Sequence, residues 1–504
     1  INTTIANNIA YDGSELGPET GGGGLYSMMG TINIKNSILW GNTAEAGSNF
    51  GNQIFVNSGT VYLSYCDIEQ GIGDIVGPVL LDNSISSNPG FANPENDDFR
   101  LYFSSPCVNV GNNTYNTESK DIRGQNRIQN TTIDMGAYEW TESSDPWGTY
   151  YVTTTGAGTK DGTSWANAFE GLQNALDVAV SCDTIWVKAG TYNPTSAYDL
   201  TDSSRYYHFR MKNGVKIYGG FAGTENPATF DLANRDFTAN ETILSGDIGN
   251  ENVNTDNCYH IFYHPNGLGL TSSAVLDGFT ISGANANEVV QPHYLGGAIF
   301  IDNSSPVIRN CWLRNNRAGN GSAIFLIASS SEFVNVIVSN NEATSYGTIF
   351  IQGPSSPIFN NNLIFDNTAN FYGAGILNFS EGGVEIINTT ITNNAAIGGS
   401  GNGGGLYNIS SGTVNFKNSI LWGNTADAKS NQGNQIFISS GAVYLSYCDI
   451  EQGVGDIEGP VSLDNTISSN PKFVDAANSD FRIYENSPCV DAGDNDYNDL
   501  TTDI

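Results

Sequence analysis

The chain has 504 residues, 58 of them glycine, and its acidic residues outnumber the basic ones 52 to 19. The formal net charge of −33 argues against binding to a nucleic-acid backbone, which requires clustered Lys and Arg. No run of residues approaches the roughly 18 consecutive apolar side chains of a membrane span. Abundant Gly and Asn favour short strands joined by turns, so we expect an all-β chain.

The first feature along the chain is a block that is duplicated later. Residues 36–44 return 382 positions further on as residues 418–426, and residues 62–70 return as 444–452. Residues 1–5 echo 387–391, and residues 503–504 echo 121–122. We therefore expect this chain to be a segment of a longer array of tandem units. Residues 1–140 form the C-terminal part of one unit, 141–148 a short linker, and 149–504 a second unit that lacks its last residues.

The duplicated block carries a repeated pair of cysteines. Cys66 and Cys107 have the same spacing as Cys448 and Cys489. Two interpretations stay open: a disulfide in each unit, or small buried apolar side chains in the core. No CxxC pair or Cys/His cluster indicates zinc.

The start of the second unit contains one stretch with helical spacing. Its apolar residues lie three or four positions apart, at Trp165, Phe169, Leu172, Leu176 and Val180. Either Thr163 or Ser164 is available as N-cap. We predict a short amphipathic helix that caps the first coil, because the end of a stack of strands otherwise exposes apolar side chains and unpaired edges.

Further along, residues 295–424 carry a finer repeat. Gly-Ala-Ile-Phe at 297–300 has counterparts at 322–325, 347–350, 375–377 and 405–407, a spacing of 25 residues that later lengthens to nearly 30. A period of this length, made of short apolar runs separated by Gly, Asn and Ser, is typical of one coil of a parallel β-solenoid. Helical repeats would show apolar residues every three or four positions, and these coils do not.

Each coil also carries two asparagines, six positions apart. The first asparagine column consists of Asn310, Asn335, Asn361, Asn388 and Asn418. The second asparagine column consists of Asn316, Asn341, Asn367, Asn394 and Asn424. Because coils stack at the strand spacing of about 4.8 Å, we expect the members of a column to lie one above another and to form a ladder of side-chain amides.

The repeats resemble known families of bacterial surface proteins. Gly-Gly-Ala-Ile with aliphatic-x-x-Asn is similar to the repeats of chlamydial polymorphic outer-membrane proteins and to the pectate-lyase-like right-handed parallel β-helix. Residues 151–192 resemble the start of secreted β-helix proteins of Bacteroidetes, and residues 105–111 with 134–139 resemble their choice-of-anchor Q region. The resemblance implies tandem right-handed parallel β-helix units, each with a short N-terminal capping helix, in an extracellular or cell-surface location.

Candidate sites are few. β-Helices that cleave polysaccharides need paired carboxylates, or acidic calcium ligands beside a basic residue, and the charges of these coils form no such column. We interpret His260 and His264 as surface polar residues, not as a metal or catalytic site. Two acidic loops could bind calcium or be solvated turns, and no other cofactor is expected. Their candidate ligands are Asp247, Glu251, Asp256, Asp494 and Asp496.

The sequence thus predicts a non-catalytic structural segment of a long extracellular fibre or cell-surface adhesin. Tandem copies extend reach and multiply weak contacts, whereas catalysis gains little from them. The expected partners are neighbouring units end to end, and surface glycans or other cells. Two alternatives remain: a polysaccharide lyase or hydrolase, favoured only by fold analogy, or a glycan-binding module. In the latter, sugars would stack on exposed aromatic residues such as Trp312, Tyr346, Phe371 and Tyr372.

Overall fold

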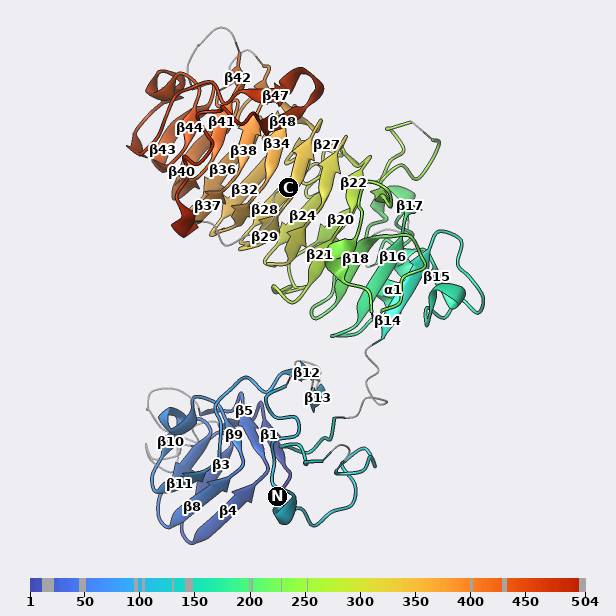
Figure 1. The fold of residues 1–504 in the computed structure, drawn as a ribbon, viewed down its shortest axis with the longest axis vertical. Coiled ribbons are helices and arrows are strands. Elements are labelled where there is room, and N and C mark those ends of the chain that lie inside the picture. Colours follow the sequence, from blue (N-terminus) through green and yellow to red (C-terminus); the bar gives the residue numbers. More distant parts are fainter. Residues whose placement is uncertain are drawn as a thin grey trace. The chain divides into compact units, whose positions relative to one another are not determined.

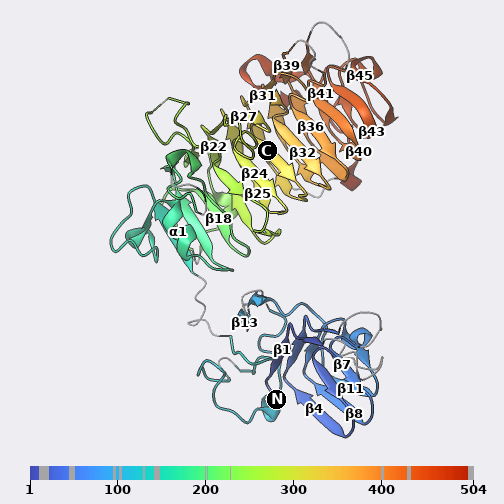
Figure 2. The ribbon, with the colours of Figure 1, turned by 180° about the vertical axis from the view of Figure 1, so that it is seen from behind.

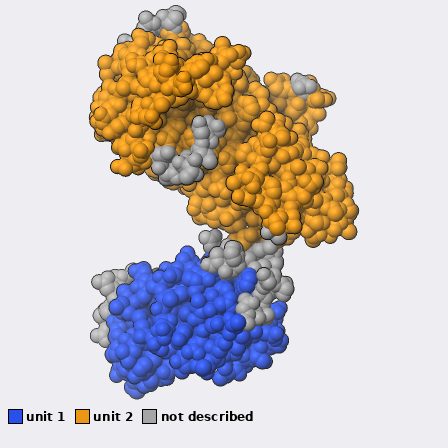
Figure 3. Space-filling model, viewed as in Figure 1, with its two compact units in different colours: residues 1–146 blue, residues 147–504 orange. Residues whose placement is uncertain are grey.

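The chain divides into two compact units, Ile1–Pro146 (unit 1) and Trp147–Ile504 (unit 2), which Figure 3 distinguishes by colour. The computed structural model describes residues 1–10, 22–44, 51–94, 98–101, 105–128, 131–140, 148–198, 200, 203–227, 229–251, 253–398, 402–427 and 433–497. The linker expected at 141–148 therefore lies outside the described residues, apart from Gly148.

Each unit is a parallel β-helix of the right-handed type, in which the strands of one coil pair in parallel with the equivalent strands of the next coil (Figure 1). One coil of unit 2 contains β24 (Ile299–Asp302), β25 (Val307–Arg309), β26 (Trp312–Arg314) and β27 (Arg317–Asn320). The register places Ile299 beside Ile324, then Ile349, then Ile376. The prediction of an all-β parallel β-helix is confirmed.

The described residues of unit 1 form four small parallel sheets and one antiparallel pair. The parallel sheets are β1 (Thr4–Ala6), β5 (Ile38–Trp40) and β9 (Asp67–Ile68); β3 (Leu25–Ser27), β7 (Ile54–Val56) and β10 (Ile75–Val76); β4 (Thr31–Lys35), β8 (Thr60–Ser64) and β11 (Val79–Asp82); and β2 (Ile9–Ala10) with β6 (Thr43–Ala44). The antiparallel pair is β12 (Phe91–Asn93) with β13 (Asp98–Leu101).

The largest sheet of unit 2, part of which is visible in Figure 2, contains 18 of the described strands. Besides β24 and β25 these are β14 (Thr149–Thr153), β15 (Phe169–Glu170), β16 (Thr184–Lys188), β18 (Lys216–Phe221), β20 (Phe262–His264), β21 (Val275–Asp277), β28 (Ile324–Ile327), β29 (Glu332–Val334), β32 (Ile349–Gly353), β33 (Ile358–Asn360), β36 (Ile376–Ser380), β37 (Gly383–Ile387), β40 (Leu406–Lys417), β43 (Ile436–Ser446), β45 (Ile457–Glu458) and β46 (Val461–Asp464).

In the described part of unit 2, two further parallel sheets and one antiparallel pair accompany this large sheet. With β26, the nine-stranded sheet contains β17 (Gly190–Tyr192), β19 (Thr242–Ser245), β22 (Thr280–Ser282), β30 (Ile337–Ser339), β34 (Leu363–Phe365), β38 (Thr390–Thr392), β41 (Ile420–Trp422) and β44 (Asp449–Ile450). With β27, the six-stranded sheet contains β23 (Asn285–Ala286), β31 (Glu342–Tyr346), β35 (Thr368–Ala369), β39 (Ala395–Ala396) and β42 (Thr425–Ala426). The antiparallel pair is β47 (Phe473–Asp475) with β48 (Asp480–Ile483).

The core of unit 2 is one continuous column of buried apolar side chains that runs from Val152 to Ile450. A single coil cannot bury its inward-facing residues alone, so burial comes from stacking on both neighbours. Leu172 and Leu176 of α1 (Leu172–Val178), the one α-helix among the described residues, join this column at its start. In the part of the chain that the structure describes, no helix is long and apolar enough to cross a membrane.

The helix α1 is shorter than predicted. Residues Trp165–Asn167 form a 3-10 turn and Phe169 enters β15, which pairs with β14. Trp165 packs edge-on against Tyr151, with ring centroids 4.8 Å apart, and this aromatic contact holds the chain away from a helical path. The helix then begins after Gly171, whose φ of 77° suits glycine, so neither Thr163 nor Ser164 caps it.

Candidate functional sites

The first asparagine column lies at a tight turn between two strands of each coil. All five members have φ between 49° and 56°, a left-handed conformation that Asn adopts more readily than most residues. The Nδ2 of Asn335 donates to Oδ1 of Asn310 at 3.1 Å, and Nδ2 of Asn361 donates to Oδ1 of Asn335 at 2.7 Å. Asn418 donates to Asn388 in the same way at 3.2 Å.

The hydrogen bonds of this column begin at a carboxylate, and one of them goes to an asparagine outside the column. At its start, Nδ2 of Asn310 donates to Oδ1 of Asp277 at 2.8 Å. Asp277 is buried and also pairs with the buried Arg235 at 2.9 Å. Further along, Nδ2 of Asn388 donates to Oδ1 of Asn360, which precedes the expected partner in the sequence, at 3.4 Å.

The second asparagine column is buried inside the stack. Asn367 is typical: its Oδ1 accepts from both the backbone N–H and the Nδ2 of Asn341, each at 3.0 Å. Its Nδ2 donates to Oδ1 of Asn394 at 2.9 Å and to the carbonyl of Val338 at 2.9 Å. A buried amide survives only if its hydrogen bonds are made, so this column ties each coil to its neighbours.

The second column ends in a relay that sequence reasoning missed. Nδ2 of Asn424 donates to Oε1 of Gln435 at 2.7 Å, and Nε2 of Gln435 donates to Glu451 at 3.0 Å. In unit 1 the same relay, with distances of 2.7 and 2.9 Å, consists of Asn42, Gln53 and Glu69. All three residues are identical in the two copies, and this identity could have revealed the relay from the sequence.

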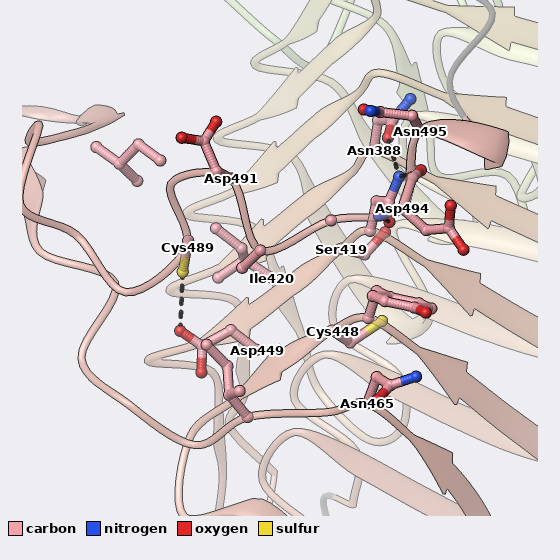
Figure 4. A pocket seen from close by; sticks show the side chains of 16 residues that line it. Asn388, Ser419, Ile420, Cys448, Asp449, Asn465, Cys489, Asp491, Asp494 and Asn495 are labelled. Atoms are coloured by element: carbon pink, nitrogen blue, oxygen red, sulfur yellow. Dashed lines mark hydrogen bonds between the residues drawn. The ribbon is translucent and has the colours of Figure 1, made fainter.

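The repeated cysteines form thiol–carboxylate pairs. All seven cysteines are free, so the disulfide interpretation is wrong. The Sγ of Cys107 donates to Oδ2 of Asp67 at 3.1 Å, and Cys489 contacts Asp449 in the same way at 3.0 Å (Figure 4). The other cysteine of each pair is buried, and the Sγ of Cys66 donates to a backbone carbonyl. Burial raises the pKa of the Asp67 carboxyl to about 6 and that of the Cys489 thiol to about 12.

The histidines are buried, so the interpretation of His260 and His264 as surface residues is wrong. Nε2 of His260 lies 3.1 Å from Nδ1 of His293, and Nδ1 of His260 lies 2.8 Å from a backbone carbonyl. The ring of Tyr263 packs against both of these histidines and against His208. Burial lowers the pKa of His260 and of His264 to about 3. The rings of His260 and His264 are therefore neutral at pH 7.

The candidate calcium ligands bond within their own loops. Oδ2 of Asp256 accepts from the backbone N–H of Asn250 at 2.8 Å, and Oδ1 of Asp494 accepts from the backbone N–H of Asp496 at 3.0 Å. Glu251 is exposed and Asp247 half-buried. Within the described residues, no three His, Cys, Asp or Glu side chains are grouped so that they could hold a metal ion.

The side of unit 2 near β22, β26 and β30 carries an aromatic pocket of about 490 Å³. Phe237 and Trp312 line it, and the guanidinium of Arg314 lies 4.2 Å from the Trp312 ring. Arg314 also pairs with Glu241 at 2.8 Å. The loop that carries Phe237 is fixed by Arg235, whose buried ion pair with Asp277 is described above, so the pocket is preformed.

The other aromatic residues named as glycan contacts pack on one another, and Tyr346 and Tyr372 are half-buried. Tyr346 and Tyr372 lie 5.6 Å apart between ring centroids, and Tyr372 and Tyr407 lie 4.7 Å apart. Phe371 packs against Tyr346 at 5.4 Å. Their rings thus continue the stacking of the coils.

A second pocket of about 410 Å³ lies against β41 and β44 of unit 2 (Figure 4). Ile420, Ile483 and Cys489 form its apolar wall, and Asn418 and Gly493 lie at its polar edge. The edge is held by two hydrogen bonds of 2.8 Å each between the side chain of Asn418 and the backbone of Asp494.

The fold and these sites define a parallel β-helix protein of two units whose repeated polar residues lie in the stack. No family model matches the chain, and no curated protein matches it. Among solved structures, pectate lyase Pel9A aligns with a TM-score of 0.42 and 13% identity over 67% of this chain and 90% of that chain. A rhamnogalacturonan lyase aligns with a TM-score of 0.40 and 16% identity over 70% of this chain and 97% of that one. Identities this low carry no information on activity.

Proposed function

We propose that this chain is a structural segment of a long extracellular fibre or cell-surface adhesin, built from tandem β-helix units and without catalytic activity. One observation carries the proposal: the same chain of side-chain hydrogen bonds occurs inside each of the two units. Asn42, Gln53 and Glu69 recur as Asn424, Gln435 and Glu451 with nearly the same distances. Duplication has therefore kept the residues that hold coils together.

The proposal includes a family assignment. The opening of unit 2 at residues 151–192 and the motif at residues 134–139 support a place among Bacteroidetes-type surface β-helix proteins with a choice-of-anchor Q region. Such a protein would work outside the cell or on its surface, where a net charge of −33 keeps neighbouring copies apart in solution. Its expected partners are neighbouring units end to end.

Electron microscopy of the purified protein, and of versions carrying additional copies of residues 149–504, tests the fibre proposal. We expect stiff rods whose length increases in proportion to the number of units. Globular particles of constant length would contradict it. As a separate control, the protein is incubated with acidic and neutral polysaccharides. Release of unsaturated or reducing sugar ends, abolished by substituting one carboxylate, would show that the chain is an enzyme.

The aromatic pocket supports a second candidate function, glycan binding by the same chain. Apolar rings beside a few fixed polar groups are typical of sugar sites, because pyranose rings present C–H groups on one face and hydroxyls at the edge. Phe237 and Trp312 supply the rings, and the paired Glu241 and Arg314 can bond hydroxyls. A net charge of −33 repels polyanions, so we expect neutral oligosaccharides.

Titration calorimetry with neutral oligosaccharides tests this second candidate. Phe237→Ala, which is 37% exposed in the native protein, should abolish binding without unfolding the chain. Phe371→Ala is the matched control, because Phe371 is equally exposed and does not line the pocket. Equal loss of binding in both variants, or unchanged binding in Phe237→Ala, would exclude the pocket as the site.

A further inference from the structure

A loop of unit 2 holds buried oxygen atoms that receive no hydrogen bond from the described part of the chain. The loop leaves the stack after β19 and returns at Cys258, whose N–H donates to the carbonyl of Gly246 at 2.9 Å. The three oxygens are Oδ1 of Asp256, Oδ1 of Asn257 and Oδ1 of Asn285. A buried carboxylate or amide oxygen without a partner costs free energy, so each of them calls for a positive group that the surrounding side chains do not supply.

The two amide groups lie where this loop contacts the next coil. Nδ2 of Asn257 donates to the carbonyl of Gly283 at 2.6 Å, so this side chain extends from the loop to the coil. Nδ2 of Asn285 donates to the carbonyl of Asn254 at 2.6 Å, so this side chain extends from the coil to the loop. Both residues are at least nine-tenths buried, with 6% and 1% of their surface exposed. Because Asp256 directly precedes Asn257, all three oxygens belong to one contact between loop and stack.

None of the three oxygens can satisfy another, because carboxylate and amide oxygens only accept hydrogen bonds. The orientation of both amides is fixed, since turning either one would place its oxygen against a backbone carbonyl. The other carboxylate oxygen of Asp256 accepts from the backbone N–H and the Nδ2 of Asn250, at 2.8 and 3.0 Å. A Cβ on Gly249 would lie 2.2 Å from that oxygen, so the close approach of the loop to Asp256 requires glycine.

The charge around this contact favours a cation. Residues 246–258 contain three acidic residues and no Lys or Arg. Arg205 donates to the backbone carbonyls of Asn257 and Asn285, at 2.8 and 2.9 Å, and its guanidinium lies 4.1 Å from the ring of Tyr259. This arginine therefore fixes both asparagines through their backbone, and its described hydrogen bonds do not reach their Oδ1 atoms.

We propose that Asp256, Asn257 and Asn285 form a calcium site that ties this loop to the stack. Calcium takes about six to eight oxygen ligands, among them carboxylates, amide carbonyls and water, in flexible geometry. Two of the three side-chain ligands are amides, so the site does not depend on a cluster of acidic residues. The ion joins residues of two coils and offsets the negative charge of the loop, and its binding therefore stabilises the folded state of unit 2.

Titration calorimetry of the full chain with calcium chloride, after treatment with a chelator, tests the proposal. Potassium chloride at about 0.15 M screens diffuse binding to the net charge. We expect saturable binding with a dissociation constant of about 0.1–1 mM, the range of sites with few charged ligands. Asp256→Asn should weaken binding by about tenfold or more, because it removes the charged ligand.

Asp236→Asn is the matched control for this variant. Asp236 also accepts two backbone N–H groups of its own loop, those of Thr238 and Ala239, but is not part of the site. It should bind calcium as the unaltered protein does. Absence of saturable binding at about 10 mM calcium would overturn the proposal, and so would equal binding by Asp256→Asn and Asp236→Asn.

A second readout uses the unaltered protein and therefore does not depend on the folding of a variant. In scanning calorimetry, calcium at about ten times its dissociation constant should raise the unfolding temperature of unit 2 by about 2 °C. Magnesium at the same concentration should raise it by less than about half as much, because Mg²⁺ demands octahedral geometry and gives up its waters reluctantly. Equal shifts with the two ions would show that they act through general charge screening, and the calcium site would be excluded.

Discussion

Cys107 donates its thiol hydrogen to the carboxylate of Asp67, and Cys489 and Asp449 repeat this contact 382 residues later. The repeated spacing of the cysteines thus has a cause other than a disulfide. Each thiol closes the segment 105–111, or its counterpart in unit 2, onto the last parallel strands of its stack. The carboxylate gains one hydrogen bond from this contact but loses most of its hydration.

Removing the Asp67 charge should change how the stability of unit 1 depends on pH. Burial raises the pKa of Asp67 from 3.8 to about 6, so the folded state binds its proton more tightly than the unfolded state. Its contribution to stability therefore increases as the pH falls from about 6 to about 4. Asp67→Asn should reduce the increase and leave the part due to Asp134, whose pKa burial also raises to about 6, as measured by calorimetric unfolding of unit 1 at several pH values. The exposed Asp82→Asn serves as control and should keep the increase.

Acid should destabilise unit 2 through its histidines. All four histidines of the chain lie in unit 2, and the pKa of His260 and of His264 is lowered by burial to about 3. A histidine with a lowered folded pKa contributes stability that is full above about 6.5 and is lost as the pH falls towards 3. The expected loss is about 1.4 kcal/mol per pH unit for each histidine.

Calorimetry between pH 7 and pH 4 tests this expectation. The transition of unit 2 should move to lower temperature, and its shift should shrink in His264→Gln. If that transition kept the same temperature at pH 7 and pH 4, the burial of neutral histidines in solution would be excluded.

Replacing one asparagine of the second column should lower the free energy of unfolding. Asn367→Ala leaves the backbone N–H of Asn341 and the carbonyl of Val338 without the partners they now have. Each buried group left unsatisfied costs about 1–3 kcal/mol, so we expect the free energy of unfolding to fall by about 3 kcal/mol or more. Chemical denaturation measures it. Asn254→Ala, at an exposed position, should change stability by less than about 0.5 kcal/mol.

Substitutions in the first asparagine column should distinguish two contributions to stability, that of the side-chain hydrogen bond and that of the left-handed backbone conformation. Asn335 has φ of 54°, so Asn335→Ala and Asn335→Gly both lose the amide ladder but only Ala strains the turn. We expect the free energy of unfolding of Asn335→Ala to be about 1 kcal/mol lower than that of Asn335→Gly. At Asn415, within the extended strand β40, the order should reverse because glycine is disfavoured there. The same order at both positions would contradict this explanation.

The sequence allowed the repeated parts of the fold to be predicted because they depend on short-range periodicity. Ile299, Ile324 and Ile349 recur at the coil spacing, and each packs on the next through a parallel strand pair. The asparagines of the second column also recur, so their stacking follows from the same spacing. The α1 prediction was too long because Trp165 contacts Tyr151 and Phe221, and no local pattern encodes these contacts.

By itself, the sequence determined the all-β composition, the coil spacing and the stacked columns, since a one-dimensional repeat places equivalent residues one above another. Only the tertiary structure decided which residues outside the coil repeat lie on the sides of the stack. It placed Cys107 on Asp67, Tyr263 among the histidines, and the segment at Ile133 on Gly111. These contacts join residues from different coils and loops, and the coil repeat does not predict which residues they join.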